Sequence, residues 1–238
     1  MLEATVNRLL EELPDDAVVL DIGAWGCPFR RADWVLDHMP YETRGLYGFD
    51  GPEPERFDAS RWIQRDICDH EPLPFGDDEI DFVICSHTLE DVRDPIWVCQ
   101  EIARIGKAGY IEVPSRVEEQ TYGIQGEWVG WGHHHWLVDI ADNNIDFFFK
   151  HHIVNGKPAA RFPAGWMDGL APEERVQQLW WTDTFTVREV TFAKYEDTDT
   201  YLESFVQKEM SRRGVPTSVE PERRGRFLET LRAKAKSR

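Results

Sequence analysis

Short apolar segments separated by polar breaks run through the first half of the chain and predict strands. Residues 17–20 are wholly apolar, include two adjacent valines and are too short for a helix, which is typical of a strand buried on both faces. Four further short segments predict strands, at residues 32–37, 62–67, 80–85 and 108–113. Apolar residues at helical spacing predict helices over residues 2–13 and 96–105. Strands and helices that alternate in this way indicate an α/β fold with a mostly parallel sheet.

The second half of the chain has a different pattern. Residues 136–140 and 145–150 flank the turn sequence ADNN and predict a hairpin, which would supply the antiparallel end of the sheet. The other elements expected here are a helix near residues 172–181, a strand at 184–192 and helices at 201–210 and 227–231.

The first predicted strand ends in an acidic residue and a turn rich in glycine. Asp21 is followed by Gly23 and then, after Ala24 and Trp25, by Gly26. Glycine lets the backbone turn sharply and lets a ligand approach closely, and Asp21 puts a carboxylate where open α/β sheets bind ligands. The segment resembles the first motif of class I S-adenosylmethionine-dependent methyltransferases, an acidic residue followed by closely spaced glycines.

A second segment carries the same resemblance. Residues 79–95, EIDFVICSHTLEDVRDP, are similar to the fourth-strand motif of methyltransferases that act on small molecules. Ser86 and His87 follow this strand and, by the resemblance, would lie beside the methyl donor. Glu90 and Asp91 are expected on the solvated face of a turn or helix start.

The order and spacing of these pieces match the family over residues 17–115. The resemblance implies a Rossmann-like domain over residues 1–155, with a mostly parallel sheet and flanking helices. Residues 156–238 are expected to form a C-terminal strand and helix extension packed on it. The first crossover looks shortened, because Gly23 lies closer to residue 32 than the dozen or so residues that a parallel crossover usually takes. Either the crossover helix is reduced to a turn, or the second strand lies elsewhere.

The resemblance implies S-adenosylmethionine as the methyl donor and S-adenosylhomocysteine as the product. The turn at residues 21–26 would cradle the amino-acid portion of the donor. Asp66 with Ile67 would lie beside the adenine. A carboxylate there can accept a hydrogen bond from the exocyclic amine of adenine. Ser86 would complete this donor site.

The ribose of the donor has two candidate ligands. Asp37 ends the second predicted strand, and two vicinal hydroxyl donors suit one bidentate carboxylate. If residues 32–37 are not the second strand, Asp50 takes this role instead.

The acceptor is expected to bind at residues 121–136, which mix aromatic residues with glycines and three consecutive histidines. Tyr122, Trp128 and Trp131 are the candidate substrate residues, because aromatic faces suit sugar or ring substrates. An oxygen acceptor gains from a general base, and histidine suits this task by its near-neutral pKa. The candidate bases are His87, His133, His134 and His135.

The triple histidine raises the question of a metal. In an extended chain His133 and His135 would share one face and His134 the other, with at least one of them facing the pocket. Adjacent histidines cannot all reach one ion from a strand, and no acid or cysteine stands at a familiar ligand spacing. No metal is therefore predicted, unless the hairpin brings His151 and His152 near.

Composition and charge narrow the partners. The net charge is −17, and residues 1–200 hold 17 Lys and Arg against 39 Asp and Glu, which gives −22 for that part. Such an acidic body repels phosphate backbones, so no nucleic-acid partner is expected. No apolar run approaches a membrane span, and the four cysteines form no CxxC pair, which favours a cytoplasmic protein with reduced thiols.

The leading hypothesis is O-methylation of a sugar-containing or aromatic metabolite by a histidine-assisted methyltransferase. N-methylation of an amine is the alternative, because an acidic body attracts a cation. A protein that binds S-adenosylmethionine without turnover is a rival from another class, and a metal-dependent hydrolase is a third. No feature of the sequence predicts the oligomeric state.

Overall fold

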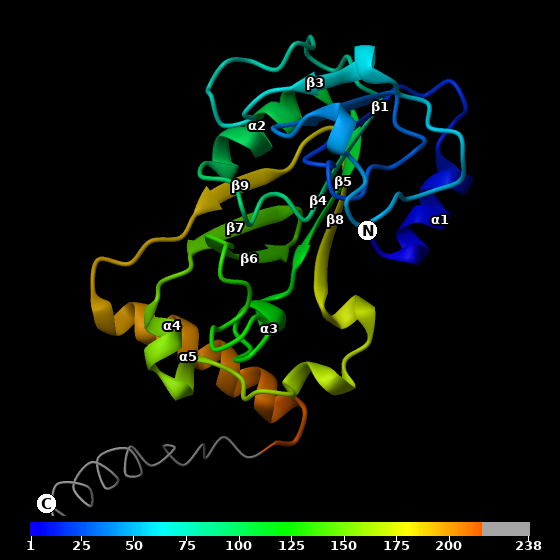
Figure 1. The fold of residues 1–238 in the computed structure, drawn as a ribbon. Helices are drawn as coiled ribbons and strands as arrows, with labels where there is room; N and C mark the ends of the chain where they lie inside the picture. Colours follow the sequence, from blue (N-terminus) through cyan, green and yellow to red (C-terminus); the bar gives the residue numbers. More distant parts are fainter. Residues whose placement is uncertain (216–238) are drawn as a thin grey trace, which may run out of the picture.

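The computed structural model describes residues 1–215 and is built on a six-stranded sheet (Figure 1). In spatial order the strands are β3 (Trp62–Gln64), β2 (Trp34–Asp37), β1 (Val19–Ile22), β4 (Phe82–Ser86), β5 (Ala108–Pro114) and β8 (Val176–Thr182). The first five strands run parallel, and β8 pairs antiparallel with β5 at the edge. The predicted α/β fold with a mostly parallel sheet is confirmed.

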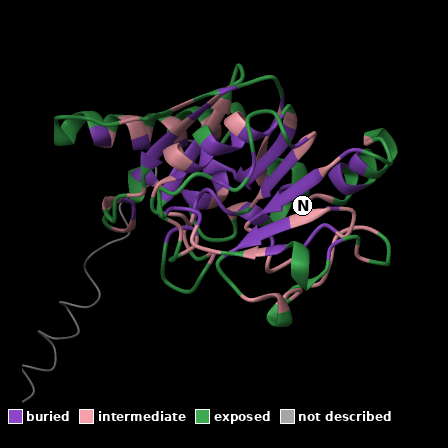
Figure 2. Cartoon of the chain, turned by 90° about the horizontal axis from the view of Figure 1, so that it is seen from above, coloured by how far each residue is buried: buried purple, intermediate pink, exposed green. Residues whose placement is uncertain are grey.

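The central strand β1 is buried on both faces, as its uninterrupted apolarity predicts. Val19 packs in one cluster with residues of helix α1 (Glu3–Glu12), whereas Leu20 and Ile22 pack in another with residues of helix α2 (Pro95–Ile105). The two helices therefore cover opposite faces of the sheet. Figure 2 shows the result, with the central strands largely buried and the helix surfaces and loops around them more exposed.

The first crossover, between β1 and β2, contains no helix. Its place is taken by an irregular segment whose fully buried Phe29 and Ala32 pack in the same cluster as α1. The backbone N–H of Phe29 donates to Asp21 Oδ2 at 2.9 Å, which ties the segment to the sheet. The crossover helix is thus reduced to turns, and the assignment of residues 32–37 to the second strand is confirmed.

A second sheet of three strands lies beside the first. It consists of β6 (Trp136–Ala141), β7 (Asn144–Phe149) and β9 (Thr186–Glu189). The predicted hairpin is confirmed, with Asp142 and Asn143 at its tip in the left-handed region that such turns require. The prediction that this hairpin supplies the antiparallel end of the main sheet is wrong, because β8 occupies that edge.

The helix predicted near residues 172–181 is also wrong. A short 3₁₀ turn at Pro172–Glu174 leads directly into β8. Leu179 and Trp181 pack into the cluster below α2, while Trp180 packs on Tyr110 on the other face of the sheet, with ring centroids 4.6 Å apart and the rings tilted by 52°. The apolar residues of β8 are thus adjacent and contact both faces, and so short an apolar segment does not by its periodicity separate a strand from a helix.

The rest of the C-terminal part is helical. Helix α5 (Tyr195–Arg212) confirms the helix predicted at residues 201–210 and packs by Leu202, Val206 and Met210 on the segments around the short helices α3 (Arg116–Glu119) and α4 (Ile153–Gly156). The helix predicted at 227–231 lies outside the described residues. The division at residue 155 stays a prediction, and β8 from its C-terminal side belongs to the same sheet as β1. Within residues 1–215, no helix combines the length and apolarity needed to cross a membrane.

Candidate functional site

Two adjoining cavities open at the carboxyl ends of the central strands. The larger has a volume of about 530 Å³ and the smaller about 200 Å³. Four residues line both, namely Gly23, Asp37, His87 and Asp91. Small-molecule sites of α/β sheets occur at this edge and occupy roughly 300–1,000 Å³. The cavities therefore form one candidate site.

The turn after β1 forms the floor of this site. Gly23 has φ +72°, and a Cβ at this position would lie 2.1 Å from Oγ1 of Thr88. Its N–H donates to the carbonyl of Leu36 at 2.8 Å. No larger residue fits here, because Thr88 packs directly on the backbone of the turn, and Gly23 itself lines both cavities. Ala24, Trp25 and Gly26 line the larger cavity with it.

Asp37 lies at the carboxyl end of β2, where the ribose ligand is expected. Its Oδ2 accepts from the N–H of Trp25 and its Oδ1 from the N–H of Met39, both at 2.8 Å. Burial raises the pKa of Asp37 above its ordinary value. The alternative acid, Asp50, lines only the larger cavity and has its Oδ2 3.1 Å from the backbone nitrogen of Met1.

Asp21 is buried in the middle of the sheet. One carboxylate oxygen accepts from Phe29, as described above, and the residue also lines the larger cavity. Burial raises the pKa of Asp21 to about 8. Its clearest contact is therefore with the crossover segment, which it holds against β1.

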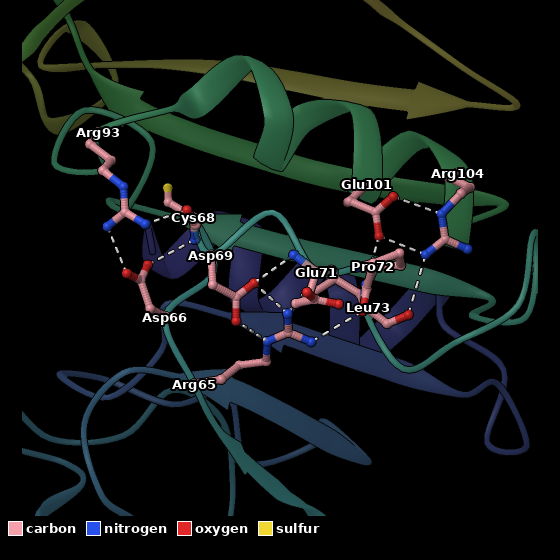
Figure 3. A network of polar contacts seen from close by, with 10 residues as sticks. All are labelled: Arg65, Asp66, Cys68, Asp69, Glu71, Pro72, Leu73, Arg93, Glu101 and Arg104. Carbon is pink, nitrogen blue, oxygen red and sulfur yellow. Dashed lines mark hydrogen bonds and ion pairs between the residues drawn. The ribbon is translucent and has the colours of Figure 1, made fainter.

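Asp66 and Ile67, the predicted adenine residues, line the smaller cavity after β3. Asp66 Oδ2 accepts from the guanidinium of Arg93 at 2.6 Å, and its Oδ1 accepts from the N–H of Cys68 at 2.8 Å. These bonds, the Cys68 N–H foremost, lower the pKa of Asp66. Figure 3 shows Asp66 and Arg93 at one end of a polar network that fixes this loop.

His87 stands at the end of β4 in a backbone conformation that is rare outside glycine, with φ +52°. Its Nε2 lies 3.2 Å from Glu112 Oε1 and its Nδ1 lies 3.6 Å from Glu90 Oε1. Burial lowers the pKa of His87, but the two carboxylates outweigh this effect and raise it to about 9. The imidazole is therefore protonated at neutral pH.

Glu112, in β5, is one of the two carboxylates that face the imidazole of His87. It is 1% exposed and accepts from Ser86 Oγ at 3.2 Å and from the hydroxyl of Tyr110. Burial raises the pKa of Glu112, but hydrogen bonds from His87 and Tyr110 outweigh it and lower the pKa to about 2. Ser86 was predicted to belong to the donor site. It lines the larger cavity and also donates a hydrogen bond to the carboxylate of Glu112.

The three consecutive histidines do not alternate between two faces. The chain turns at Gly132 and His133 before β6 begins, so the extended geometry assumed from the sequence is wrong. His133 and His134 lie together at the larger cavity, with ring centroids 4.5 Å apart. His135 is exposed and lines neither cavity.

The sequence suggested that Glu90 and Asp91 lie on a solvated face, which is wrong for Glu90, whereas Asp91 is half-exposed. Glu90 is 1% exposed, and neither of its carboxylate oxygens has a hydrogen-bond partner. Its carbonyl accepts from the N–H groups of His135 and Trp136, at 2.7 and 3.3 Å, so the histidine segment covers this turn. Both acids line the larger cavity. Only this packing of distant segments buries Glu90, and no local pattern in the sequence signals it.

The predicted aromatic residues are only partly brought to the site. Trp131 lines the larger cavity, and its indole N–H donates to Glu118 at 2.8 Å. The guanidinium of Arg161 lies over the ring of Tyr122, 4.3 Å from the ring centroid, and Trp128 is 59% exposed. Neither of these two lines the cavities.

The long loop between β2 and β3 supplies a wall that the sequence did not specify. The N–H of Gly45 donates to the carbonyl of Trp25, and that of Tyr47 to the carbonyl of Gly26, both at 2.8 Å. The loop therefore lies against the glycine turn, and the Tyr47 ring lines the larger cavity. Its length and its richness in proline and glycine were the available signals.

Comparison with known sequences gives one family. Residues 46–111 match a family model described as a methyltransferase domain, and this match begins inside the long loop between β2 and β3 and ends inside β5. A search of curated protein sequences finds no match.

Comparison with solved structures returns methyltransferases at low similarity. A complex of the Haloferax volcanii Trm112 methyltransferase activator with a methyltransferase gives 20% identity over 58% of this chain and 70% of that one, with a TM-score of 0.33. An S-adenosylmethionine dependent methyltransferase from Mesorhizobium loti gives 13% identity over 62% and 64%, with a TM-score of 0.34. The YcgJ protein of Bacillus subtilis gives 18% over 48% and 52%, with a TM-score of 0.32.

Proposed function

We propose that the chain is a class I, S-adenosylmethionine-dependent methyltransferase and that it methylates a hydroxyl group of a small molecule. The observation that carries this proposal is the paired cavity at the carboxyl ends of β1, β2 and β4, with Gly23 and Asp37 lining both parts. The sheet edge, the side-chain-free turn and the carboxylate are features that a nucleoside-containing donor requires.

The residues present fit S-adenosylmethionine. The turn at Gly23, which lines both cavities, would accommodate the amino-acid portion, Asp37 would accept from the ribose hydroxyls, and Asp66 with Ile67 would border the adenine in the smaller cavity. The donor, when bound, supplies an electrophilic methyl group on a sulfonium. The chain must then hold the acceptor oxygen in line with the departing sulfur and exclude water.

His87 is the residue proposed to accept the proton of the acceptor hydroxyl. It lines both cavities, and only its neutral form, a minority at neutral pH, can act as the base. Once the proton has transferred, the resulting imidazolium lies between the carboxylates of Glu90 and Glu112, which stabilise it. Trp131 would offer its aromatic face to the acceptor, and His133 and His134 border the same space.

A second candidate, N-methylation of an amine, is supported by Glu90. Neither oxygen of its buried carboxylate has a hydrogen-bond partner; Oε1 faces the imidazole of His87 at 3.6 Å, and Oε2 is left to favour a cationic ligand. No lysine or arginine of residues 1–215 lines either cavity. The same lining argues against a nucleic-acid acceptor, whose phosphates need basic residues.

The proposal is tested by transfer of a radiolabelled methyl group from S-adenosylmethionine to panels of sugars, phenols and amines. Label in a hydroxyl compound, lost in the His87→Gln variant, supports O-methylation with His87 as base. Label confined to amines favours the second candidate. Saturable donor binding with no turnover on any panel would contradict both and favour a protein that binds the donor without catalysis.

A further inference from the structure

Three side chains at the mouth of the larger cavity converge on one point. Oδ1 of Asp91 lies 3.9 Å from Nε2 of His133 and 3.8 Å from Nε2 of His134. The potential ligand atoms of the three residues all lie within 4.8 Å of one another. Ligand atoms around a tetrahedral zinc ion are about 3.3–3.5 Å apart, as bond lengths of about 2.0–2.1 Å require. The two separations between Asp91 and the imidazoles exceed this value by about 0.3–0.6 Å.

The orientation of His134 is fixed from behind. Its Nδ1 lies 2.7 Å from Glu119 Oε1, and this carboxylate is 1% exposed. Glu119 is in turn paired with the ammonium of Lys150 at 2.6 Å. A carboxylate on the far nitrogen of a histidine is the usual support for a metal-ligating imidazole, because it directs the other nitrogen's lone pair at the ion.

Asp91 supplies an independent observation. Its Oδ1 is buried and has no hydrogen-bond partner, although it lies opposite two imidazoles. A buried carboxylate oxygen left without a partner favours a cation at that point. His134 is nearly buried, at 7% exposure, whereas His133 and Asp91 are partly open toward the cavity.

We propose that Asp91, His133 and His134 bind one divalent transition-metal ion of the zinc class. Two imidazoles and one carboxylate form a ligand set that such ions favour, and three protein ligands leave a coordination position free on the cavity side. The turn at residues 132–133 removes the objection drawn from the sequence, since the two histidines do not point to opposite faces of a strand.

The position of the ion suggests its use, which rests on the proposed function. Asp91 borders both cavities together with Gly23 and His87, so the free coordination position faces the acceptor space. An acceptor hydroxyl bound there would lose its proton more readily and would be held in a fixed direction. The ion would thus select acceptors with a hydroxyl group that can coordinate a metal.

The same contacts also describe an arrangement without metal, in which a protonated His134 lies between Glu119 and Asp91. The two arrangements differ in the role of His133. In an ion pair its removal changes little, because its Nε2 lies 3.9 Å from Asp91. In a metal site its removal takes away one of three ligands.

The test is zinc titration calorimetry on the 238-residue chain, freed of any histidine tag and of bound metal by a chelator. We expect one ion per chain with submicromolar affinity, and visible absorption bands of a low-coordinate site when cobalt replaces zinc. His133→Ala and Asp91→Asn should each weaken zinc binding at least tenfold. His152→Ala, an exposed histidine outside both cavities, is the matched control and should leave the affinity unchanged.

Two results would overturn the proposal, namely no saturable zinc binding, or equal affinity in the wild type, His133→Ala and His152→Ala. Titration of S-adenosylmethionine into the metal-free protein is run in parallel. Zinc binding without donor binding would contradict the proposed function alone. Donor binding without zinc binding would contradict the metal site alone. The contacts of His134 with Glu119 and Asp91 would then be ion pairs.

Discussion

A Cβ added to Gly23 would lie 2.1 Å from Oγ1 of Thr88, well inside contact distance. Thr88 belongs to the turn after β4, and its hydroxyl donates to the carbonyl of Gly23 at 3.3 Å. The turns that follow β1 and β4 therefore fit together only because residue 23 has no side chain. This contact sets the floor of the candidate donor site.

Gly23→Ala should damage both stability and donor binding. The added methyl group meets Thr88, and alanine is strained at φ +72°, so we expect a loss of about 2–4 kcal/mol in the free energy of unfolding. Affinity for S-adenosylmethionine should fall at least tenfold. Gly169→Ala is the control, because nothing lies within 4 Å of its added Cβ. Urea denaturation and calorimetry measure the two effects, and wild-type behaviour of Gly23→Ala would contradict the tight fit.

The rate of methyl transfer should rise with pH if His87 is the base. Glu90 and Glu112 raise its pKa to about 9 against the effect of burial, so the neutral fraction grows about tenfold per pH unit below that value. We expect kcat to increase from pH 6.5 and to level off near pH 9. His87→Gln should lower kcat about 100-fold or more and remove this rise. A profile that is flat in the wild type, or equally steep in the variant, would exclude His87 as the base.

Glu90→Gln should move the same profile to lower pH. Glu90 Oε1 lies 3.6 Å from Nδ1 of His87 and helps to raise the pKa of the imidazole. A neutral amide removes this effect, so the midpoint should fall from about 9 toward the ordinary value of 6.5. At pH 7.5 the variant would then reach a larger fraction of its maximal kcat than the wild type reaches of its own maximal kcat. An unchanged midpoint would show that Glu90 does not act on His87.

Because of Asp21, the free energy of unfolding should fall as the pH rises. Burial raises its pKa from 3.8 to about 8, so the folded state keeps a proton that the unfolded state releases. The resulting stabilisation is complete below pH 3.8 and is lost as the pH rises to about 8. Asp21→Asn stays neutral and should show a weaker fall in unfolding free energy between pH 5 and 8 than the wild type. Denaturation at several pH values measures this, and identical slopes would mean that Asp21 is ionised in the fold.

The parallel core could be predicted because its signals are local. The apolar run of β1, the glycines after it and the acid that ends β2 each occupy a few adjacent residues, and Gly23 and Asp37 do lie together at the sheet edge. The strand β8 could not be recognised, because its conformation depends on pairing with β5 and on the packing of Trp180 and Trp181 against clusters on opposite faces of the sheet. Periodicity within the segment contains no information about that partner.

The polar part of the site depends on contacts between distant segments. Glu90 is buried because the backbone of His135 and Trp136 covers it, and a charged residue in a turn otherwise predicts exposure. The cluster of His133 and His134 arises from a turn that the sequence did not distinguish from an extended strand. These residues determine the charge of the cavity, so its chemistry was the least predictable feature.

The decisive measurement is titration calorimetry of the protein with S-adenosylmethionine and S-adenosylhomocysteine, repeated with Asp37→Ala and Asp50→Ala. Asp37 lines both cavities at the end of β2, whereas Asp50 lines only the larger one. We predict micromolar binding of both ligands, weakened at least tenfold in Asp37→Ala and retained in Asp50→Ala, with folding of both variants checked by urea denaturation. Absence of binding to the wild type, or loss of binding only in Asp50→Ala, would contradict the donor site described here.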